Sequence, residues 1–356
     1  MFWIGLPSTS LDAETRLLIE EIKPGGICLF ARNCKDSSEI RTLLDALTKV
    51  LGEDVFLSID QEGGLVDRLR RIVEPMPSAS DVSRKGSPDD IRRFARFTAR
   101  ILRILGFNMN FAPVLDIIND ERRGNTNGAL ESRSFGNTAA EVVERAGIYA
   151  ETLFEEGILP CHKHFPGIGG ITIDSHEGLP EIEADRNELF SFDLVPYLEL
   201  LPTNSAHAVM TGHTVFPNFD LKETDGQGRL LPTSLSGNIV TGLLRSELGF
   251  RGLALTDDME MGAVIKNYGM AEAARLAVNA GNDGILICNS EEMIREGFRG
   301  VLEGVESGII IPERIEESFG RIESARKLLK KPVEFDKDEL ARLSREIVEL
   351  KKDINC

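Results

Sequence analysis

The chain has 356 residues, of which 42% are hydrophobic and 28% charged, and its formal net charge at pH 7 is −17. This composition supports a sizeable core and argues against wholesale disorder. Because no Lys/Arg-rich block offsets the negative charge, we expect neither nucleic acid nor an anionic membrane surface as a partner. At this length, one domain with terminal additions is the first expectation, since α/β barrels commonly fold as one domain.

The N-terminus enters a strand-like run directly, without the basic and apolar regions of a secretory signal. No apolar stretch reaches the roughly 18 residues of a spanning helix. The cysteines are odd in number, scattered and without a Cys-x-x-Cys pair: Cys28, Cys34, Cys161, Cys288 and Cys356. We therefore expect a cytoplasmic protein with free thiols, and neither a disulfide nor a zinc framework.

Short apolar runs alternate with segments of helical period, which predicts a mainly parallel sheet. Eight strands are expected: Phe2–Leu6, Gly26–Phe30, Val55–Ile59, Met109–Leu115, Ile158–Cys161, Ala206–Met210, Gly252–Thr256 and Asp283–Cys288. Helices are expected at Ala13–Ile22, Ser38–Val50, Pro88–Leu105, Ala139–Glu156, Leu235–Leu248 and Met270–Ala280. Eight such units predict an α/β fold, a TIM-like (β/α)₈ barrel over residues 1–330. The charged segment 331–356 is expected to form a helix packed on the outside of the barrel.

Polar residues follow the ends of the predicted strands: Asp60, Asp116, His162, His164, His213, Asp257 and Asn289. In a (β/α)₈ barrel the carboxyl ends of all strands meet at one mouth, so these side chains would face one another. A doubly wound open sheet would also bring strand ends to a crevice. However, neither a G-x-G-x-x-G motif nor a Walker A motif supports a nucleotide there.

All five histidines lie between residues 162 and 213. A single histidine is more often structural, but this clustering favours proton chemistry near neutral pH. His162 and His164 would share a strand face from which Lys163 points away, unless the strand has already ended. A metal site is the alternative, although a lysine is an awkward neighbour for a dication. We therefore expect no metal and no cofactor.

Asp174-Ser175-His176 follows a glycine-rich loop after the fifth strand, Pro166-Gly167-Ile168-Gly169-Gly170. A carboxylate two residues before an imidazole can accept its N–H and stabilise the imidazolium. The alternative is a purely structural role, an Asx-type turn followed by a surface histidine. The place of this tripeptide beyond a strand end favours a catalytic pair of Asp174 and His176.

Thr256-Asp257-Asp258-Met259 puts two carboxylates at the end of the seventh strand. Asp258 suits a helix N-cap. Adjacent buried acids repel each other, so we expect only one of them, Asp257, to point into the pocket.

Six motifs occur in the order and spacing of glycoside hydrolase family 3, and the chain most resembles its bacterial single-domain β-N-acetylglucosaminidases of peptidoglycan recycling. They are Ile59-Asp60-Gln61-Glu62-Gly63-Gly64 with Arg68, Asn110-Phe111-Ala112-Pro113-Val114-Leu115-Asp116, Arg133-Ser134-Phe135-Gly136, Lys163-His164-Phe165-Pro166-Gly167, Asp174-Ser175-His176 and Thr256-Asp257-Asp258-Met259. The likeness runs from the N-terminus to at least Ala263.

The resemblance implies a role for each matching residue. Asp257 would be the nucleophile, and His176 the acid/base with Asp174 as its partner. The sugar-binding groups would be Asp60, Arg68, Arg133, Lys163 and His164. The implied reaction is retaining, exo-acting hydrolysis that releases N-acetylglucosamine from cell-wall muropeptide-type fragments through a covalent glycosyl-Asp intermediate. We expect a monomer that takes a small carbohydrate.

Two residues depart from the family pattern. Ile168 stands where the family usually has a histidine, and Glu131 where a glycine commonly precedes Arg-Ser-Phe-Gly. The same scaffold would also suit a β-N-acetylglucosaminide phosphorylase, because an imidazole, unlike a carboxylate, does not repel phosphate. A β-glucosidase or β-xylosidase, a sugar-binding protein without turnover and a metal-dependent hydrolase are further alternatives.

Overall fold

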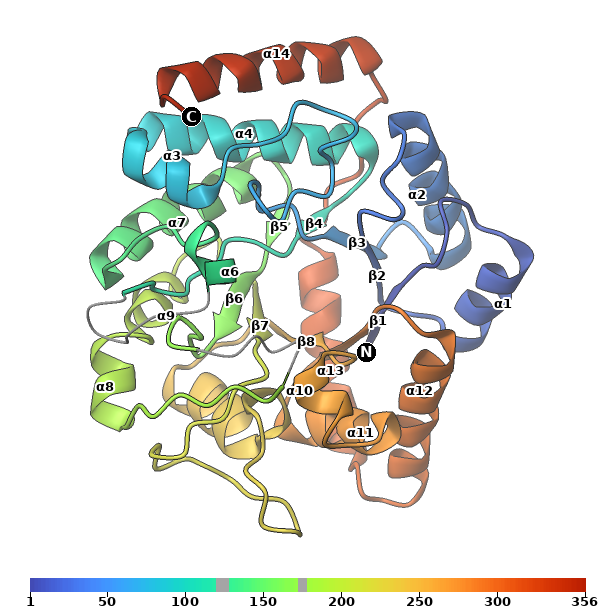
Figure 1. The fold of residues 1–356 in the computed structure, drawn as a ribbon. Coiled ribbons are helices and arrows are strands. Elements are labelled where there is room, and N and C mark those ends of the chain that lie inside the picture. The colour runs from blue at the N-terminus through green and yellow to red at the C-terminus, as the bar shows by residue number, and fades with distance from the viewer. Residues whose placement is uncertain (120–127, 172–177) are drawn as a thin grey trace.

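The computed structural model describes residues 1–119, 128–171 and 178–356. Its strand segments, all paired in parallel, are β1 (Phe2–Gly5), β2 (Gly26–Leu29), β3 (Phe56–Ile59), β4 (Met109–Asn110), β5 (Leu159–Pro160), β6 (His162–Phe165), β7 (Ala208–Thr211), β8 (Leu253–Asp258) and β9 (Gly284–Ile287). Their order is β5-β4-β3-β2-β1-β9-β8-β7-β6. Only Cys161 separates β5 from β6, so the two ends of the sheet are one interrupted strand. The sheet therefore closes into a barrel (Figure 1).

Helices surround this barrel (Figure 1). They are α1 (Ala13–Ile22), α2 (Ser37–Leu51), α3 (Ala79–Lys85), α4 (Pro88–Leu105), α6 (Gly128–Glu131), α7 (Ala139–Glu155), α8 (Arg186–Ser191), α9 (Val195–Leu200), α10 (Gly262–Ile265), α11 (Met270–Ala280), α12 (Glu291–Glu306), α13 (Pro312–Arg326) and α14 (Lys337–Asp353). A 3₁₀ turn, η1 (Thr233–Leu235), precedes a π-helix, η2 (Asn238–Glu247).

Local sequence signals explain where these helices begin and end, and α4 is an example. Ser87 and Asp90 form a reciprocal capping box at its start, with Pro88 in the first turn. Gly106 ends the helix at φ 105°, in the left-handed region that glycine adopts readily. Its apolar stripe, which includes Ile91 and Phe94, is buried. This stripe fixes which face of α4 meets the barrel and its neighbour α7.

The interior of the barrel is filled by side chains, so it is a packed core rather than a channel. Trp3 is fully buried there, and its ring lies 5.2 Å from that of Phe56. Gly26 and Gly284 on the flanking strands leave room for Trp3, because a Cβ atom would lie 2.1 Å from the indole at Gly26 and 2.7 Å from it at Gly284. Met210 and Leu286 also belong to this interior cluster.

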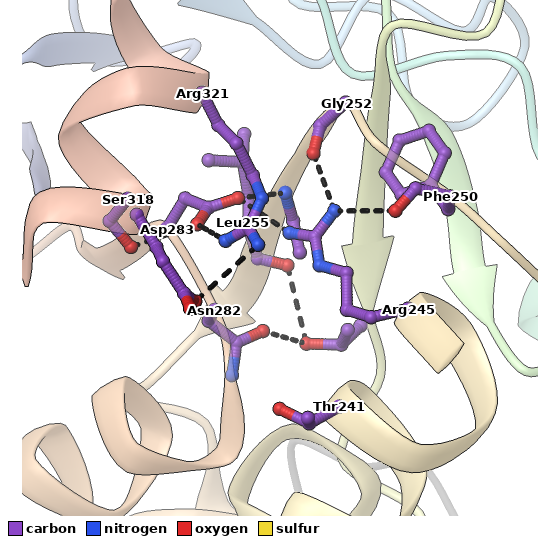
Figure 2. A network of polar contacts seen from close by, with 12 residues as sticks. Thr241, Arg245, Phe250, Gly252, Leu255, Asn282, Asp283, Ser318 and Arg321 are labelled. Carbon is purple, nitrogen blue, oxygen red and sulfur yellow. Dashed lines mark hydrogen bonds and ion pairs between the residues drawn. The ribbon is translucent and has the colours of Figure 1, made fainter. Parts of the chain in front are cut away.

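Helix α13 covers the amino-terminal end of the barrel, where Ile322 and Ala325 join the interior cluster. Beside it, Asp283 is fully buried just before β9 and accepts hydrogen bonds from arginines on two helices (Figure 2). The Nη2 of Arg245, from η2, lies 2.5 Å from Asp283 Oδ2, while Arg314 and Arg321, from α13, each lie 3.1 Å from Oδ1. This network ties the two helices to the amino ends of β8 and β9.

Helix α14 lies beside α4 on the outside of the molecule (Figure 1). One stripe of α14 is buried: Leu340, Leu343, Ile347 and Leu350. None of the described helices is long and apolar enough to span a membrane. All five cysteines are free, and only Cys356 is exposed.

The predicted barrel is confirmed, while three elements differ from expectation. The fourth strand is shorter, because the ladder beyond Asn110 runs into Pro113, which has no N–H to donate. The fifth continues through β6, so His162 and His164 belong to a strand instead of following one. The helix expected at Leu235–Leu248 is a 3₁₀ turn followed by a π-helix.

Candidate active site

A cavity of about 280 Å³ opens at the carboxyl ends of the strands. Inward-facing residues of the barrel interior line its deep end: Cys28, Met210, Leu286 and Cys288. Because the packed interior closes it on that side, the cavity is blind. Its polar lining comes from the loop after β3, from β6, from the end of β8, and from Arg133, which follows α6.

Lys163 is an almost completely buried cation of the cavity, with its side chain only 2% exposed. Its Nζ lies 2.6 Å from Asp60 Oδ1 and 2.6 Å from Glu62 Oε1. Burial alone would lower the pKa of Lys163, but the charges of Asp60 and Glu62 outweigh it and raise the pKa. Lys163 is therefore a fixed cation between two carboxylates.

Glu62 holds a second cation, Arg133, through a two-pronged ion pair. Arg133 Nε lies 2.7 Å from Glu62 Oε2, and Arg133 Nη2 lies 2.9 Å from Glu62 Oε1. Burial would raise the pKa of Glu62, but the positive charges of Arg133 and Lys163 hold that pKa well below its usual range. Glu62 thus stays ionised and fixes the distance between the two cations.

Arg68 completes the cationic side of the cavity from the loop after β3. Its Nη2 lies 3.8 Å from Asp60 Oδ2, and its guanidinium lies 5.7 Å from the centre of the Phe30 ring. Asp60 therefore stands between Lys163 and Arg68, with its side chain 18% exposed. A partly exposed carboxylate held between two cations can accept hydrogen bonds from the hydroxyls of a ligand.

His164 lies between the cations and the end of β8. Its Nδ1 lies 2.7 Å from Asp116 Oδ2, and its Nε2 lies 3.4 Å from Arg133 Nη2 and 3.9 Å from Asp257 Oδ2. Asp116 is fully buried, and its Oδ1 also accepts the backbone N–H of Ile168 at 2.8 Å. Asp116 therefore sets the orientation of the imidazole and the start of the following loop together.

Asp257 and Asp258 both line the cavity, at the end of β8. Asp257 Oδ1 accepts the backbone N–H of Asp258 at 2.8 Å. Burial would raise the pKa of Asp257, but His164, His213 and Lys163 lower it below its ordinary value. Asp257, which lies beside the cation cluster of Lys163, Arg133 and Arg68, is therefore ionised.

The pKa of Asp258 moves in the opposite direction, to about 7, chiefly because the carboxyl is buried and also because Glu260 and Asp257 lie near it. Asp258 Oδ2 accepts a hydrogen bond from Asn289 Nδ2 at 3.2 Å, and its Oδ1 accepts the N–H of Glu260 at 3.1 Å. The expectation that only Asp257 would face the pocket is wrong. The raised pKa of Asp258 relieves the repulsion that led to that expectation.

The sequence profile described as the glycosyl hydrolase family 3 N-terminal domain matches residues 4–325. This chain belongs to glycosyl hydrolase family 3. The match begins within β1 and covers the rest of the barrel, including every element that contributes to the cavity.

Similar proteins agree with the family. Beta-hexosaminidase A of Pseudoalteromonas piscicida is 31% identical over 336 residues, 88% of this chain and 55% of that protein. Beta-hexosaminidase of Tolumonas auensis is 30% identical over 306 residues, 85% of this chain and 86% of that protein. A solved family 3 β-N-acetylglucosaminidase from Paenibacillus sp. has a TM-score of 0.86 and 34% identity, covering 98% of this chain and 67% of that one. The chain thus spans about half the length of the first of these relatives.

Six of the eight predicted site residues are brought together in the cavity of this family 3 barrel: Asp60, Arg68, Arg133, Lys163, His164 and Asp257. Asp174 and His176 lie outside the described residues. His162 is buried but does not line the cavity, and Lys163 and His164 both do. The alternation predicted for this strand is therefore wrong, because its ladder has an irregular register between His162 and Phe165.

No role in the site was predicted for Glu62 or Asp258, and Asp116 was expected only as one of the polar residues at the mouth of the barrel. All three lie within the family motifs, and that position was the further signal that could have identified them. Ile168, one of the two departures, is buried and lines the cavity. In the part of the chain that the structure describes, no three His, Cys, Asp or Glu side chains gather as a metal site.

Asp258→Asn is expected to remove a pH dependence of stability. An unfolded aspartate titrates near 3.8 and folded Asp258 at about 7. The folded state therefore binds the extra proton, and wild-type stability falls as the pH rises between these values. Asparagine does not ionise, so the variant's gain in thermal unfolding midpoint over wild type should be larger at pH 8 than at pH 5.

Asp257→Asn is the matched control for this measurement. The folded pKa of Asp257 is lowered, so its stabilising contribution is lost only as the pH falls through that lowered value, below this window. Because the charge of Asp257 contributes to the raised pKa of Asp258, the difference between Asp257→Asn and wild type should change somewhat between the two pH values, but less than that of Asp258→Asn. An Asp258→Asn difference that is equal at pH 5 and pH 8 would contradict the raised pKa.

Proposed function

We propose that this chain is a retaining exo-β-N-acetylglucosaminidase in which Asp257 is the nucleophile. The observation that carries the proposal is an ionised carboxylate at the end of β8, facing a blind cavity beside a fixed cluster of cations. Relatives that cover most of this chain are named beta-hexosaminidases, and a similar solved structure is a family 3 β-N-acetylglucosaminidase. Both names fit a sugar carrying an N-acetyl group.

Asp257 would attack the anomeric carbon and form a covalent glycosyl-enzyme. An ionised carboxylate is the nucleophilic form, and the lowered pKa keeps Asp257 in that form at neutral pH. Water would then displace the carboxylate from the sugar, and two inversions at the same carbon give net retention. His164, 3.9 Å from Asp257, would contact the sugar close to the reacting carbon.

The proton would be handled by His176, with Asp174 as its partner. The imidazolium would protonate the departing oxygen, and the neutral imidazole would accept a proton from the attacking water. Supporting this assignment, Ile171 lines the cavity five residues before His176 in the sequence. The last described residue before His176 therefore lies at the wall of the cavity.

The cation cluster would bind the sugar hydroxyls. Lys163 and Arg133 can donate hydrogen bonds, while Asp60 can accept them. Because Glu62 joins the two cations, these donors are held in place before the sugar arrives. Such a preorganised set lowers the cost of binding and fixes the ring relative to Asp257. Arg68 and His164 would supply the remaining sugar contacts.

The proposed substrates are cell-wall fragments of the muropeptide type that end in N-acetylglucosamine. A blind cavity of about 280 Å³ accepts the end of a chain and not its middle, which favours exo action. We also propose a cytoplasmic monomer in which residues 1–330 are the catalytic unit and 331–356 an external helical extension.

A panel of aryl glycosides tests the proposal. The β-N-acetylglucosaminide should be hydrolysed with a kcat/KM on the order of 10²-fold or more above the β-glucoside and β-xyloside, because a site built for the amide loses its hydrogen bonds with other sugars. The product should be free N-acetylglucosamine, and its rate of formation should not change when inorganic phosphate is added.

Each other outcome points to a different function. Formation of the sugar 1-phosphate would identify a phosphorylase, and a preference for glucoside or xyloside would identify another glycosidase. Saturable binding of N-acetylglucosamine without turnover would identify a sugar-binding protein. Loss of hydrolysis after treatment with a chelator would identify a metal-dependent enzyme.

A further inference from the structure

His213 is a buried histidine for which the proposed reaction has no use. It follows β7 by two residues, and its side chain lies behind the end of β8. Its Nε2 lies 3.1 Å from the backbone carbonyl oxygen of Asp258, and its Nδ1 lies 2.7 Å from Ser234 Oγ. The imidazole thus bridges the strand end that carries Asp257 and the turn η1.

The partners of His213 determine its tautomer. A carbonyl oxygen only accepts, so Nε2 carries the proton and donates to Asp258. Burial lowers the pKa of His213, although Asp257 opposes this. The ring is therefore neutral at neutral pH, and Nδ1 accepts the hydroxyl proton of Ser234. Ser234, His213 and the Asp258 carbonyl form one directional relay of hydrogen bonds.

The donor end of this relay is firmly held. Ser234 is fully buried, and its carbonyl oxygen accepts Asn282 Nδ2 at 2.8 Å. Its N–H donates to the carbonyl oxygen of Gly212 at 3.2 Å, and the neighbouring Thr233 N–H donates to Thr214 at 2.9 Å. The turn therefore keeps a fixed position relative to the segment that carries His213.

The other end of the relay reaches the carboxylate. Asp257 Oδ1 accepts the N–H of Asp258 at 2.8 Å, so the orientation of the Asp257 side chain depends on where the backbone of Asp258 lies. His213 fixes that backbone from the carbonyl on the far side of the same residue. A shift of the Asp258 backbone would turn the carboxylate out of line with the anomeric carbon.

We infer that His213 is a positioning residue for the nucleophile, acting with Ser234 through the backbone of Asp258. This inference rests on the proposed role of Asp257. His213 does not line the cavity, so its effect should fall on the rate of attack more than on sugar binding. Misplacing a reacting group by about 1 Å can cost on the order of 10²-fold in rate.

The test compares His213→Ala, His213→Gln and Ser234→Ala in the full chain. His213→Ala should lower kcat for an aryl β-N-acetylglucosaminide by about 10²-fold while KM changes less than about threefold. Glutamine can place an amide N–H near the position of Nε2, so His213→Gln should recover about tenfold of that loss. Ser234→Ala should lower kcat by about tenfold, because the ring keeps one of its two hydrogen bonds.

Covalent trapping measures the attack directly. A 5-fluoro-N-acetylglucosaminyl fluoride releases fluoride as Asp257 forms its ester, and the slowly hydrolysed adduct is read by mass spectrometry. The rate of labelling should fall in His213→Ala in parallel with kcat, while inhibition by free N-acetylglucosamine should be unchanged. His207→Gln is the matched control, because His207 directly precedes the same strand at its other end.

Each result decides the inference. Wild-type labelling rates in both His213→Ala and Ser234→Ala would overturn it, as would equal losses in His207→Gln. If His213→Ala does not fold, His213→Gln and Ser234→Ala decide by the same criteria. Failure of the proposed function gives a different result, because wild type would then not be labelled at Asp257 at all.

Discussion

Replacing Asp257 with alanine is expected to abolish release of nitrophenol from an aryl β-N-acetylglucosaminide, lowering kcat by on the order of 10⁴-fold or more. The covalent route needs a carboxylate in line with the anomeric carbon, and alanine leaves none there. Asp258→Asn is the matched comparison from the same strand end, and it should keep kcat within about tenfold of wild type. Initial rates at saturating substrate measure both.

Azide provides a second readout, which distinguishes loss of the nucleophile from loss of folding, because an unfolded variant would form no glycosyl azide. The cavity left in Asp257→Ala can admit this small anion, which would attack the anomeric carbon from the side that the carboxylate occupied. The β-glycoside would then give an α-glycosyl azide by a single inversion. Activity of Asp257→Ala within tenfold of wild type would contradict the assignment, and so would a larger loss in Asp258→Asn than in Asp257→Ala.

The comparison with His176→Ala separates the nucleophile from the acid. Loss of a general acid should slow substrates with poor leaving groups more than activated aryl glycosides, since the latter need less protonation. Azide should here give a β-glycosyl azide, because the covalent intermediate still forms on Asp257. An unaltered rate in His176→Ala would contradict the proposed acid/base pair.

The barrel could be predicted from the sequence because its strands are short apolar runs separated by helical periods. The fifth strand, which was predicted to end at Cys161 but continues as β6, shows the limit of this reasoning. β6 reads His-Lys-His-Phe, and its polar residues look like the end of a strand. Two of them, Lys163 and His164, are strand residues whose side chains line the cavity, so the polar residues of the site made the strand difficult to predict.

The cavity could be predicted in part for a related reason. Lys163 and Asp257 follow from motifs in the chain, but the role of Glu62 depends on contacts between segments far apart in sequence. Arg133, for example, lies 71 residues beyond Glu62. The place of Asp258 in the cavity lining depends on a pKa of about 7, which burial and the nearby Glu260 and Asp257 produce. The spacing of residues in the sequence predicts neither the contacts of Glu62 nor the burial of Asp258.

The helix expected at Leu235–Leu248 shows a further limit. Its apolar positions face the core as predicted, and Leu243 and Leu244 are fully buried. The hydrogen bond from Leu248 N–H reaches back to Leu243, five residues earlier, at 2.9 Å. Apolar spacing reports which face is buried, but it does not distinguish this wider turn from an α-helical one.

The largest effect on stability is expected at the other end of the barrel, at Asp283. Its carboxylate is fully buried and is shared by Arg245 and Arg321, which Figure 2 labels, and by Arg314. Burial lowers the pKa of Arg245 to about 10, so this guanidinium is still charged at neutral pH. Asp283→Ala would leave it buried without its counter-ion. We expect the free energy of unfolding to fall by about 3–5 kcal/mol.

Chemical denaturation of Asp283→Ala and of Glu53→Ala measures the difference. Glu53 pairs with Lys331 at the surface, where the two side chains are 71% and 78% exposed, so breaking this pair should cost less than about 1 kcal/mol. The Asp283 network joins η2 and α13 to the amino ends of β8 and β9, whereas Asp257 lies at the carboxyl end of β8. The folded fraction of Asp283→Ala should therefore keep the wild-type kcat. A loss no larger than that of Glu53→Ala would mean that the backbone carbonyls of Phe250 and Gly252, which also accept hydrogen bonds from Arg245, are sufficient partners for its charge.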